Sequence, residues 1–176
     1  VREDITEFSE KDVLVGGYNR RGFIRNTERF LNAASDRTQY AVLFFNIKNF
    51  KAVNELFGVE NGDVVLQNIY KTLKYSRLAP VIVARVESDH FVCLIDKKNL
   101  DFAELTKVCE NKFCKDGKRM NLIIRCGIFY VEDEPMKISG MIDRAKLAKK
   151  YITDEYVQPY MIYDDSMQAA YVDKAK

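Results

Sequence analysis

The chain has 176 residues, of which 47% are hydrophobic and 31% charged, with a formal net charge of +2. This composition is typical of one folded globular domain and excludes an intrinsically disordered chain. The near balance of 28 basic and 26 acidic residues gives no electrostatic basis for a nucleic-acid partner, so we expect none. No run approaches the roughly 18 apolar residues of a membrane span, and the first residues lack the pattern of a signal peptide. We expect a cytoplasmic domain that meets a membrane only through regions outside this chain.

Apolar periodicity predicts the secondary structure in chain order. The expected helices cover residues 19–34, 49–58, 61–73, 101–114, 136–151 and 164–176, and the expected strands cover residues 40–47, 81–84, 91–95, 121–131 and 160–163. Residues 81–95 form an expected hairpin around a polar turn. Helices and strands intermix without strict alternation, which favours an α+β fold with helices over both faces of one sheet.

Three segments carry motifs whose order and spacing can be compared with known families. They read Asp-Val-Leu-Val-Gly-Gly-Tyr-Asn-Arg-Arg over 12–21, Asn-Ile-Lys-Asn-Phe-Lys-Ala-Val-Asn over 46–54 with Gly-Asp at 62–63, and Ala-Arg-Val-Glu-Ser-Asp-His-Phe over 84–91. The chain resembles GGDEF domains, which have Asp-x-Leu-Thr-Gly-Leu-x-Asn-Arg-Arg, Asp-x-Asp-x-Phe-Lys-x-x-Asn and Ala-Arg-x-Gly-Gly-Asp-Glu-Phe at these places. Cys-Gly-Ile at 126–128 and the segment 143–150 also resemble the family's Ser-Ile-Gly strand and its last conserved helix.

The resemblance implies a single palm-like domain of the nucleotidyl cyclase, ferredoxin-like type, with a central, mainly antiparallel, five-stranded sheet. It covers residues 12–163. Residues 1–11 are then a leader from an upstream region, and residues 164–176 an exit helix towards a downstream domain. The family activity is the synthesis of cyclic di-GMP by two GTP-loaded domains that meet face to face, so the resemblance also implies a homodimer and Mg²⁺.

The metal site of the family departs from its usual pattern here. Family members supply a strand-end Asp, the next backbone carbonyl and the acidic third residue of the hairpin, and these positions hold Asn46, Ile47 and Asp89. Lys48 replaces the family's second Asp, so the formal charge of positions 46 and 48 changes from −2 to +1. We expect Mg²⁺ binding to be weak or lost. Two alternatives are an Asn46 amide that only satisfies the backbone, and a Lys48 ammonium that meets phosphates in place of the metal.

The signature hairpin is altered as well. Glu87 and Ser88 replace the two glycines, whose positive φ and missing Cβ let a ligand approach the backbone. His90 replaces the following Glu, and we interpret it as an exposed turn residue rather than a general base. With Asn46, these are the catalytic positions that we predict to be degenerate.

The nucleotide-binding positions are better preserved. Asn54 and Asp63 match the residues that recognise guanine, while Lys51 and Lys150 match family lysines, of which Lys150 contacts the triphosphate. The family arginine four residues after Lys150 is Asp154 here, which weakens the expected grip on the triphosphate. Structural alternatives are a helix-surface Asn54, an Asp63 that caps a helix N-terminus, and solvated lysines.

Three functions remain open from the sequence. The first is a module without cyclase activity that binds GTP or another guanine nucleotide weakly and regulates a linked EAL phosphodiesterase or sensor domain. The second is an active diguanylate cyclase with unusual metal ligands. The third is a structural dimerisation module with an empty pocket.

Overall fold

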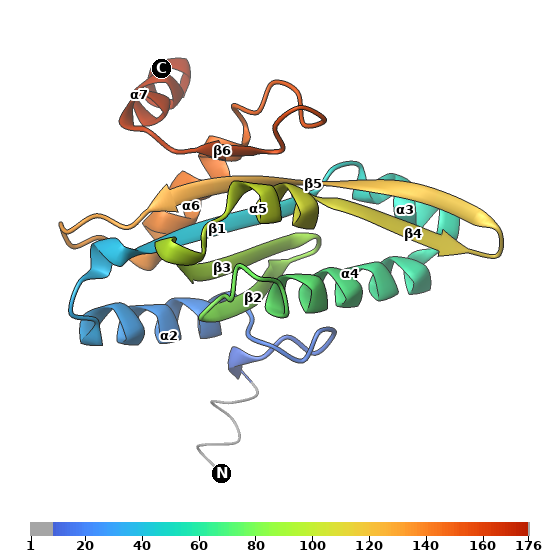
Figure 1. The fold of residues 1–176 in the computed structure, drawn as a ribbon, viewed down its shortest axis with the longest axis horizontal. Helices are drawn as coiled ribbons and strands as arrows, with labels where there is room; N and C mark the ends of the chain where they lie inside the picture. Colours follow the sequence, from blue (N-terminus) through green and yellow to red (C-terminus); the bar gives the residue numbers. More distant parts are fainter. Residues whose placement is uncertain (1–8, 176) are drawn as a thin grey trace, which may run out of the picture.

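The computed structural model describes residues 9–175, and the expected leader therefore lies largely outside the described residues. Its centre is a six-stranded sheet in the order β2-β3-β1-β5-β4, with β6 paired to β5 (Figure 1). The strands are β1 (Tyr40–Ile47), β2 (Ile82–Glu87), β3 (His90–Asp96), β4 (Glu110–Lys115), β5 (Lys118–Tyr130) and β6 (Tyr160–Ile162). The pairing is antiparallel except between β5 and β6. The predicted α+β palm-like fold is confirmed.

Helices cover both faces of the sheet because β1 is apolar on both sides. The α-helices are α2 (Arg20–Ala33), α3 (Phe50–Phe57), α4 (Val59–Lys74), α5 (Phe102–Cys109), α6 (Ile138–Lys149) and α7 (Asp165–Ala175). On one face, Leu43 and Phe45 share a core with residues of α3, α4 and α5. On the other, Val42 and Phe44 pack with residues of α2 and α6. No helix in the described chain is both long and apolar enough to cross a membrane.

The structure corrects two predicted elements. The helix expected over 101–114 ends at Cys109, and the chain continues as β4 into the long β4–β5 hairpin (Figure 1). Its turn is Asp116-Gly117, with φ of 52° and 75°, which is the typical sequence of a two-residue hairpin and should have predicted it. Phe113 then packs edge-on against Phe57 on α3, with ring centroids 5.1 Å apart. The second correction is that α4 begins at Val59, not near 61–63.

Candidate functional site

Three polar side chains form a row across the end of the sheet. Asn46 near the end of β1 pairs in register with His90 on β3 and with Arg125 on β5. Residues directly opposite each other point to the same face of a sheet, so the row shares the face of Phe44, which is two residues before Asn46. This is the face that α2 and α6 cover.

Helix α6 lies directly on β5 beside this row. A Cβ on Gly127 would come within 1.7 Å of the Ala145 carbonyl oxygen and 2.9 Å of the Lys149 nitrogen, so only glycine permits this approach. The Lys149 side chain is consequently only 8% exposed, and its ammonium lies 5.3 Å from the ring centre of Phe44. Lys146, one turn earlier, lies 5.9 Å from the same ring.

Electrostatics at the row are dominated by unpaired positive charge. Burial is the main cause that lowers the pKa of Lys149 to about 8, and the neighbouring cations Arg125 and Lys146 lower it further, while Asp89 opposes them. The Asn46 Oδ1 and Arg125 Nε atoms are buried without a hydrogen-bond partner. The Arg125 Nε donor therefore lacks an acceptor, and the Asn46 amide oxygen lacks a donor, among the described residues.

Lys48 is engaged elsewhere. Its ammonium forms an ion pair with the Glu155 carboxylate and lies 5.6 Å from the ring centre of Tyr156. The hydrogen bond that it donates raises the pKa of Lys48 and lowers that of Glu155. A phosphate that used Lys48 in place of a metal would first have to displace Glu155.

The donor set does not fit a divalent metal. One oxygen of Asp89 already accepts a 3.0 Å hydrogen bond from the Ile47 amide, and Asn46 offers an amide in place of a carboxylate. Lys149 and Arg125 add positive charge next to this position. Among the described residues, no three His, Cys, Asp or Glu side chains come together in a way that could hold a metal ion. Hard divalent cations need several anionic oxygens, which this position lacks.

The hairpin between β2 and β3 has a positive φ at one of the two positions where the family has glycine. Ser88 has φ of 42°, in the left-handed region that L-residues avoid. Arg85 supports the turn, because its Nε donates to the Ser88 carbonyl at 2.7 Å and its guanidinium pairs with Asp12 at 2.9 Å. The opening motif and the hairpin motif are thus tied together by the Asp12–Arg85 pair.

Replacing Ser88 with glycine should stabilise the protein, because it removes the strain of a positive φ. We expect a gain of about 1 kcal/mol in the free energy of unfolding, or roughly 2–4 °C in Tm. Thermal unfolding followed by circular dichroism measures this. Glu87→Gly is the matched control, since Glu87 has no positive φ, and it should not stabilise. Equal effects of the two substitutions would contradict the assignment of strain to Ser88.

The interpretation of His90 as an exposed turn residue is wrong. His90 begins β3, its side chain is 20% exposed, and its ring lies edge-on to Phe44 with centroids 5.2 Å apart. Burial lowers its pKa, with a smaller opposing effect of Asp89, so the imidazole is neutral at pH 7. Glu87 lies 3.4 Å from Nδ1. His90 is packed here because the register places it inward beside Asn46.

One of the guanine-recognition positions lies against the helix that carries the other. A Cβ on Gly62 would lie 1.9 Å from the Asn54 Oδ1 atom, so the Asn54 side chain rests against α4 at the residue that precedes Asp63 in the chain. The alternative in which Asp63 caps a helix is wrong, because α4 begins at Val59 with Gly58 as its N-cap. Asp63 forms no hydrogen bond or ion pair within the described chain, and its carboxylate is therefore available to a ligand.

The two predicted lysines lie away from the row. Lys51 has a 90% exposed side chain and faces Glu55 at 3.9 Å on the same helix, which agrees with a solvated lysine. Lys150 caps the C-terminus of α6, and its ammonium lies 5.7 Å from the ring centre of Tyr171 on α7. Neither Lys51 nor Lys150 has a contact with Asn46 or Asp89 in the structure. Their role in nucleotide binding stays a prediction.

Sequence reasoning missed two residues of the site, Arg125 in the row and Lys149 on α6. Arg125 was hidden in an apolar strand, although a charged residue there is itself a signal. Lys149 continues the spacing of the buried residues Ile142 and Ala145 on α6, and a lysine on a buried helical stripe is equally unusual.

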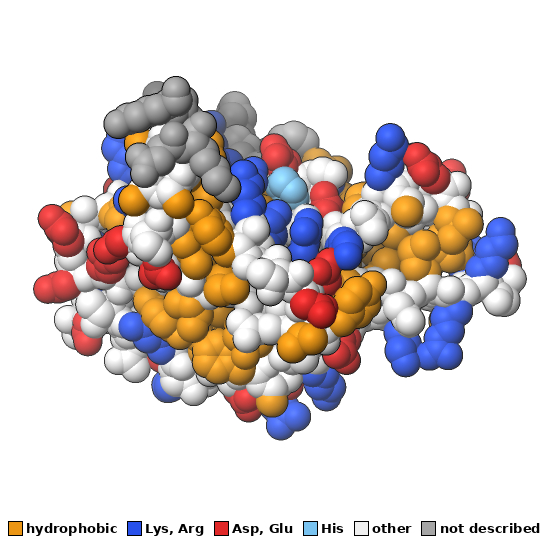
Figure 2. All heavy atoms as spheres, turned by 90° about the horizontal axis from the view of Figure 1, so that it is seen from above, with side chains coloured by type: hydrophobic (Ala, Val, Ile, Leu, Met, Phe, Trp, Pro, Cys, Tyr) orange, Lys and Arg blue, Asp and Glu red, His pale blue; other side chains and the backbone are white. Residues whose placement is uncertain are grey.

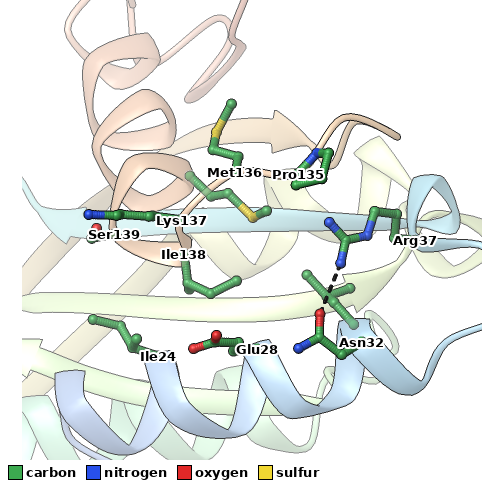
Figure 3. A pocket seen from close by; sticks show the side chains of 11 residues that line it. Ile24, Glu28, Asn32, Arg37, Pro135, Met136, Lys137, Ile138 and Ser139 are labelled. Carbon is green, nitrogen blue, oxygen red and sulfur yellow. Dashed lines mark hydrogen bonds between the residues drawn. The ribbon is translucent and has the colours of Figure 1, made fainter.

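A hollow in the surface lies at the end of the sheet opposite to the row. It has a volume of about 570 Å³ between α2 and the start of α6, with Ile24, Glu28, Arg37 and Met136 among its lining residues (Figure 3). Arg37 donates to Asn32 at 3.2 Å on its rim. None of the predicted site residues lines it, so it is separate from the row.

Comparison with known proteins decides the family. The family model for the diguanylate cyclase GGDEF domain matches residues 9–150. The chain belongs to the GGDEF domain family. Its fold is similar to the GGDEF domain of PA1120 (TpbB or YfiN) from Pseudomonas aeruginosa, with a TM-score of 0.76, 21% identity and coverage of 92% of this chain and 99% of that one. It is also similar to the coiled coil and GGDEF domain of DgcB from Caulobacter crescentus in complex with c-di-GMP, with a TM-score of 0.73, 17% identity and coverage of 92% and 89%.

Curated relatives are longer proteins. The uncharacterized protein YhcK of Bacillus subtilis is 33% identical over 94 residues, which are 52% of this chain and 26% of YhcK. The diguanylate cyclase DgcM of Escherichia coli is 31% identical over 107 residues, which are 58% of this chain and 25% of DgcM. The chain thus spans about a quarter of the length of these relatives, and this GGDEF domain is placed in the family of cyclic di-GMP signalling.

Proposed function

We propose that this GGDEF domain does not make cyclic di-GMP and acts as a guanine-nucleotide-binding regulatory module. The observation that carries the proposal is the set of groups around position 46. A cyclase needs anionic oxygens there to hold the metal that activates the attacking hydroxyl and stabilises the α-phosphate. Asn46 instead stands between His90 and Arg125, with Lys149 over the row. The surroundings favour an anion where the reaction requires a cation.

Guanine recognition is supported by the Asn54–Asp63 pair. A carboxylate can accept both N1–H and N2–H of guanine, and an amide can donate to O6 or N7. Asn54 Oδ1 lies against Gly62, the residue that precedes Asp63 on α4. A weak guanine-nucleotide site with little dependence on Mg²⁺ follows from a retained base pocket and a lost metal site.

The regulatory role requires a partner, and we propose a linked EAL phosphodiesterase or sensor domain. One relative supports this proposal: MucR of Pseudomonas aeruginosa is named a bifunctional diguanylate cyclase and cyclic di-GMP phosphodiesterase, and this chain spans 21% of its length. Helix α7 leaves the domain after β6 (Figure 1) and is a suitable connection. Phosphodiesterase assays on the full-length gene product, with and without GTP, test this role.

The cyclase prediction is that purified protein with GTP and Mg²⁺ or Mn²⁺ forms no cyclic di-GMP above a control without enzyme. Asn46→Asp alone should not restore activity, because the new carboxylate would pair with Arg125 and Lys149 rather than face a metal. Chromatography of the products measures both, with Escherichia coli DgcM as a positive control. Protein-dependent product that disappears in Asp89→Ala would overturn the proposal and favour an active cyclase with unusual ligands.

A further inference from the structure

Positive charge at the end of the sheet exceeds what the neighbouring acids neutralise. Arg125, Lys146 and Lys149 influence one another there, and Asp89 is the carboxylate that opposes them. None of the three cations forms an ion pair with a described residue. Figure 2 shows basic side chains gathered beside the single histidine on this face of the molecule. The cluster therefore retains net positive charge.

Two members of the cluster are buried in a way that calls for a partner. Lys149 is only 8% exposed, and the Arg125 Nε donor is buried with no acceptor. A buried cation or donor without a partner destabilises the fold, so native proteins almost always pair it. An anion bound at this position would supply the missing acceptors.

A hollow adjoins the cluster at Lys146 on the same face. It has a volume of about 180 Å³ and is lined by Phe44, His90 and Lys146 together with Arg20 and the acidic Glu87 and Asp143, and Phe44 is the ring over which the Lys149 ammonium lies. Glu87 is 69% exposed and forms the outer rim.

We propose that the Asn46–Arg125 row and Lys149 bind the phosphate oxygens of a pyrophosphate-type anion directly, without a metal ion. Arg125 and Lys149 donate charge-assisted hydrogen bonds, and Asn46 contributes an amide in place of a repelling carboxylate. The inference rests on the proposed function, because the anion would come from the bound guanine nucleotide. Free pyrophosphate presents the same kind of phosphate oxygens and is the second possible source. The cations take over the charge neutralisation that a metal supplies elsewhere in the family.

Calorimetry of the whole chain with pyrophosphate, in EDTA and at low ionic strength, tests the site. We expect measurable binding that Lys149→Met weakens about tenfold or more, because one charge-assisted partner is lost. Arg125→Gln should weaken it similarly. Lys107→Met is the control, since Lys107 is exposed on α5, which covers the opposite face of the sheet, and it should change affinity less than about twofold.

A further variant distinguishes loss of the anion site from unfolding of the protein. Asn46→Asp keeps the size of the side chain but provides an internal counter-ion for Arg125 and Lys149, so it should abolish pyrophosphate binding in a protein that still unfolds cooperatively. Pyrophosphate binding that is absent in the wild type, or unchanged in Lys149→Met and Asn46→Asp, would overturn the inference.

Comparing pyrophosphate, GTP and ATP shows whether the bound anion is the phosphate chain of a nucleotide or free pyrophosphate. Pyrophosphate binding together with equal affinities for GTP and ATP would support the anion site and contradict the guanine pocket. Guanine-selective binding without any pyrophosphate binding would contradict the anion site and leave the proposed function standing. GTP binding that Lys149→Met weakens as much as pyrophosphate binding identifies the nucleotide's phosphates as the occupant.

Discussion

Replacing Lys149 with methionine should stabilise the protein by about 1–3 kcal/mol at neutral pH. The pKa of Lys149 falls from 10.5 to about 8, and each unit corresponds to about 1.4 kcal/mol of differential interaction. Below pH 8 the side chain is charged in both the folded and unfolded states, so the full cost of burying the charge is present. Between pH 8 and 10.5 the folded state has released the proton and the unfolded state still holds it. Stability of the wild type therefore rises with pH through this window.

Urea unfolding at several pH values between 6.5 and 10.5 measures the effect. The advantage of Lys149→Met should be largest below pH 8 and shrink towards pH 10.5, because the stability of the wild type rises through this window while that of the variant lacks this contribution. Lys150→Met, which alters an exposed lysine on the same helix, should change stability by less than about 0.5 kcal/mol. A destabilised Lys149→Met protein, or a difference that does not depend on pH, would show that the lysine is not buried as a charge.

Lys149→Met is expected to increase the free energy of unfolding but to decrease the affinity for an anion, and these opposite effects are informative. A lysine kept only for packing could be replaced with methionine at a gain in stability. A lysine that holds an anion opposes folding of the empty protein and recovers free energy when the anion binds. Residues that serve a site at the expense of the fold are common in functional positions.

The fold could be predicted where local pattern and family motifs agreed. The strand Tyr40–Ile47 was predicted with the bounds that the structure has, because its unbroken apolar run is typical of a central strand. The β4 strand was missed because Glu110–Lys115 is mostly exposed and has a weak apolar alternation, so the preceding helical period was extended through it. The Asp116-Gly117 turn was the better signal.

The site could be predicted only in part. Motif spacing identified Asn46, Asp89 and the Asn54–Asp63 pair, but it placed the compensating cation at Lys48. The structure shows Lys48 paired with Glu155, while Lys149 and Arg125 lie beside Asn46. Their proximity depends on the register of β1 with β5 and on the close approach of α6 at Gly127. Neither is encoded in a local sequence pattern.

Guanine nucleotides should bind weakly but at least about tenfold more tightly than adenine nucleotides, with little dependence on Mg²⁺. Adenine presents an N1 acceptor where guanine presents N1–H, so the Asp63 carboxylate would face an acceptor instead of a donor. Leaving such groups unpaired costs about 1–3 kcal/mol, which corresponds to roughly tenfold or more in affinity. Calorimetry with GTP, GDP and ATP, each with Mg²⁺ and with EDTA, measures base preference and metal dependence together.

Two substitutions test whether the preference comes from this pocket. Asp63→Ala removes the acceptor and should reduce the preference to near unity. Gly62→Ala alters no charge and favours the helix by up to about 1 kcal/mol, but its new Cβ would meet the Asn54 Oδ1 atom at 1.9 Å and force that side chain to rotate. It should therefore lower guanine affinity in a protein that is no less stable. Pyrophosphate binding should survive both substitutions, because Arg125 and Lys149 are untouched. A guanine preference that persists in Asp63→Ala, or that is absent in the wild type, would favour a structural dimerisation module with an empty base pocket.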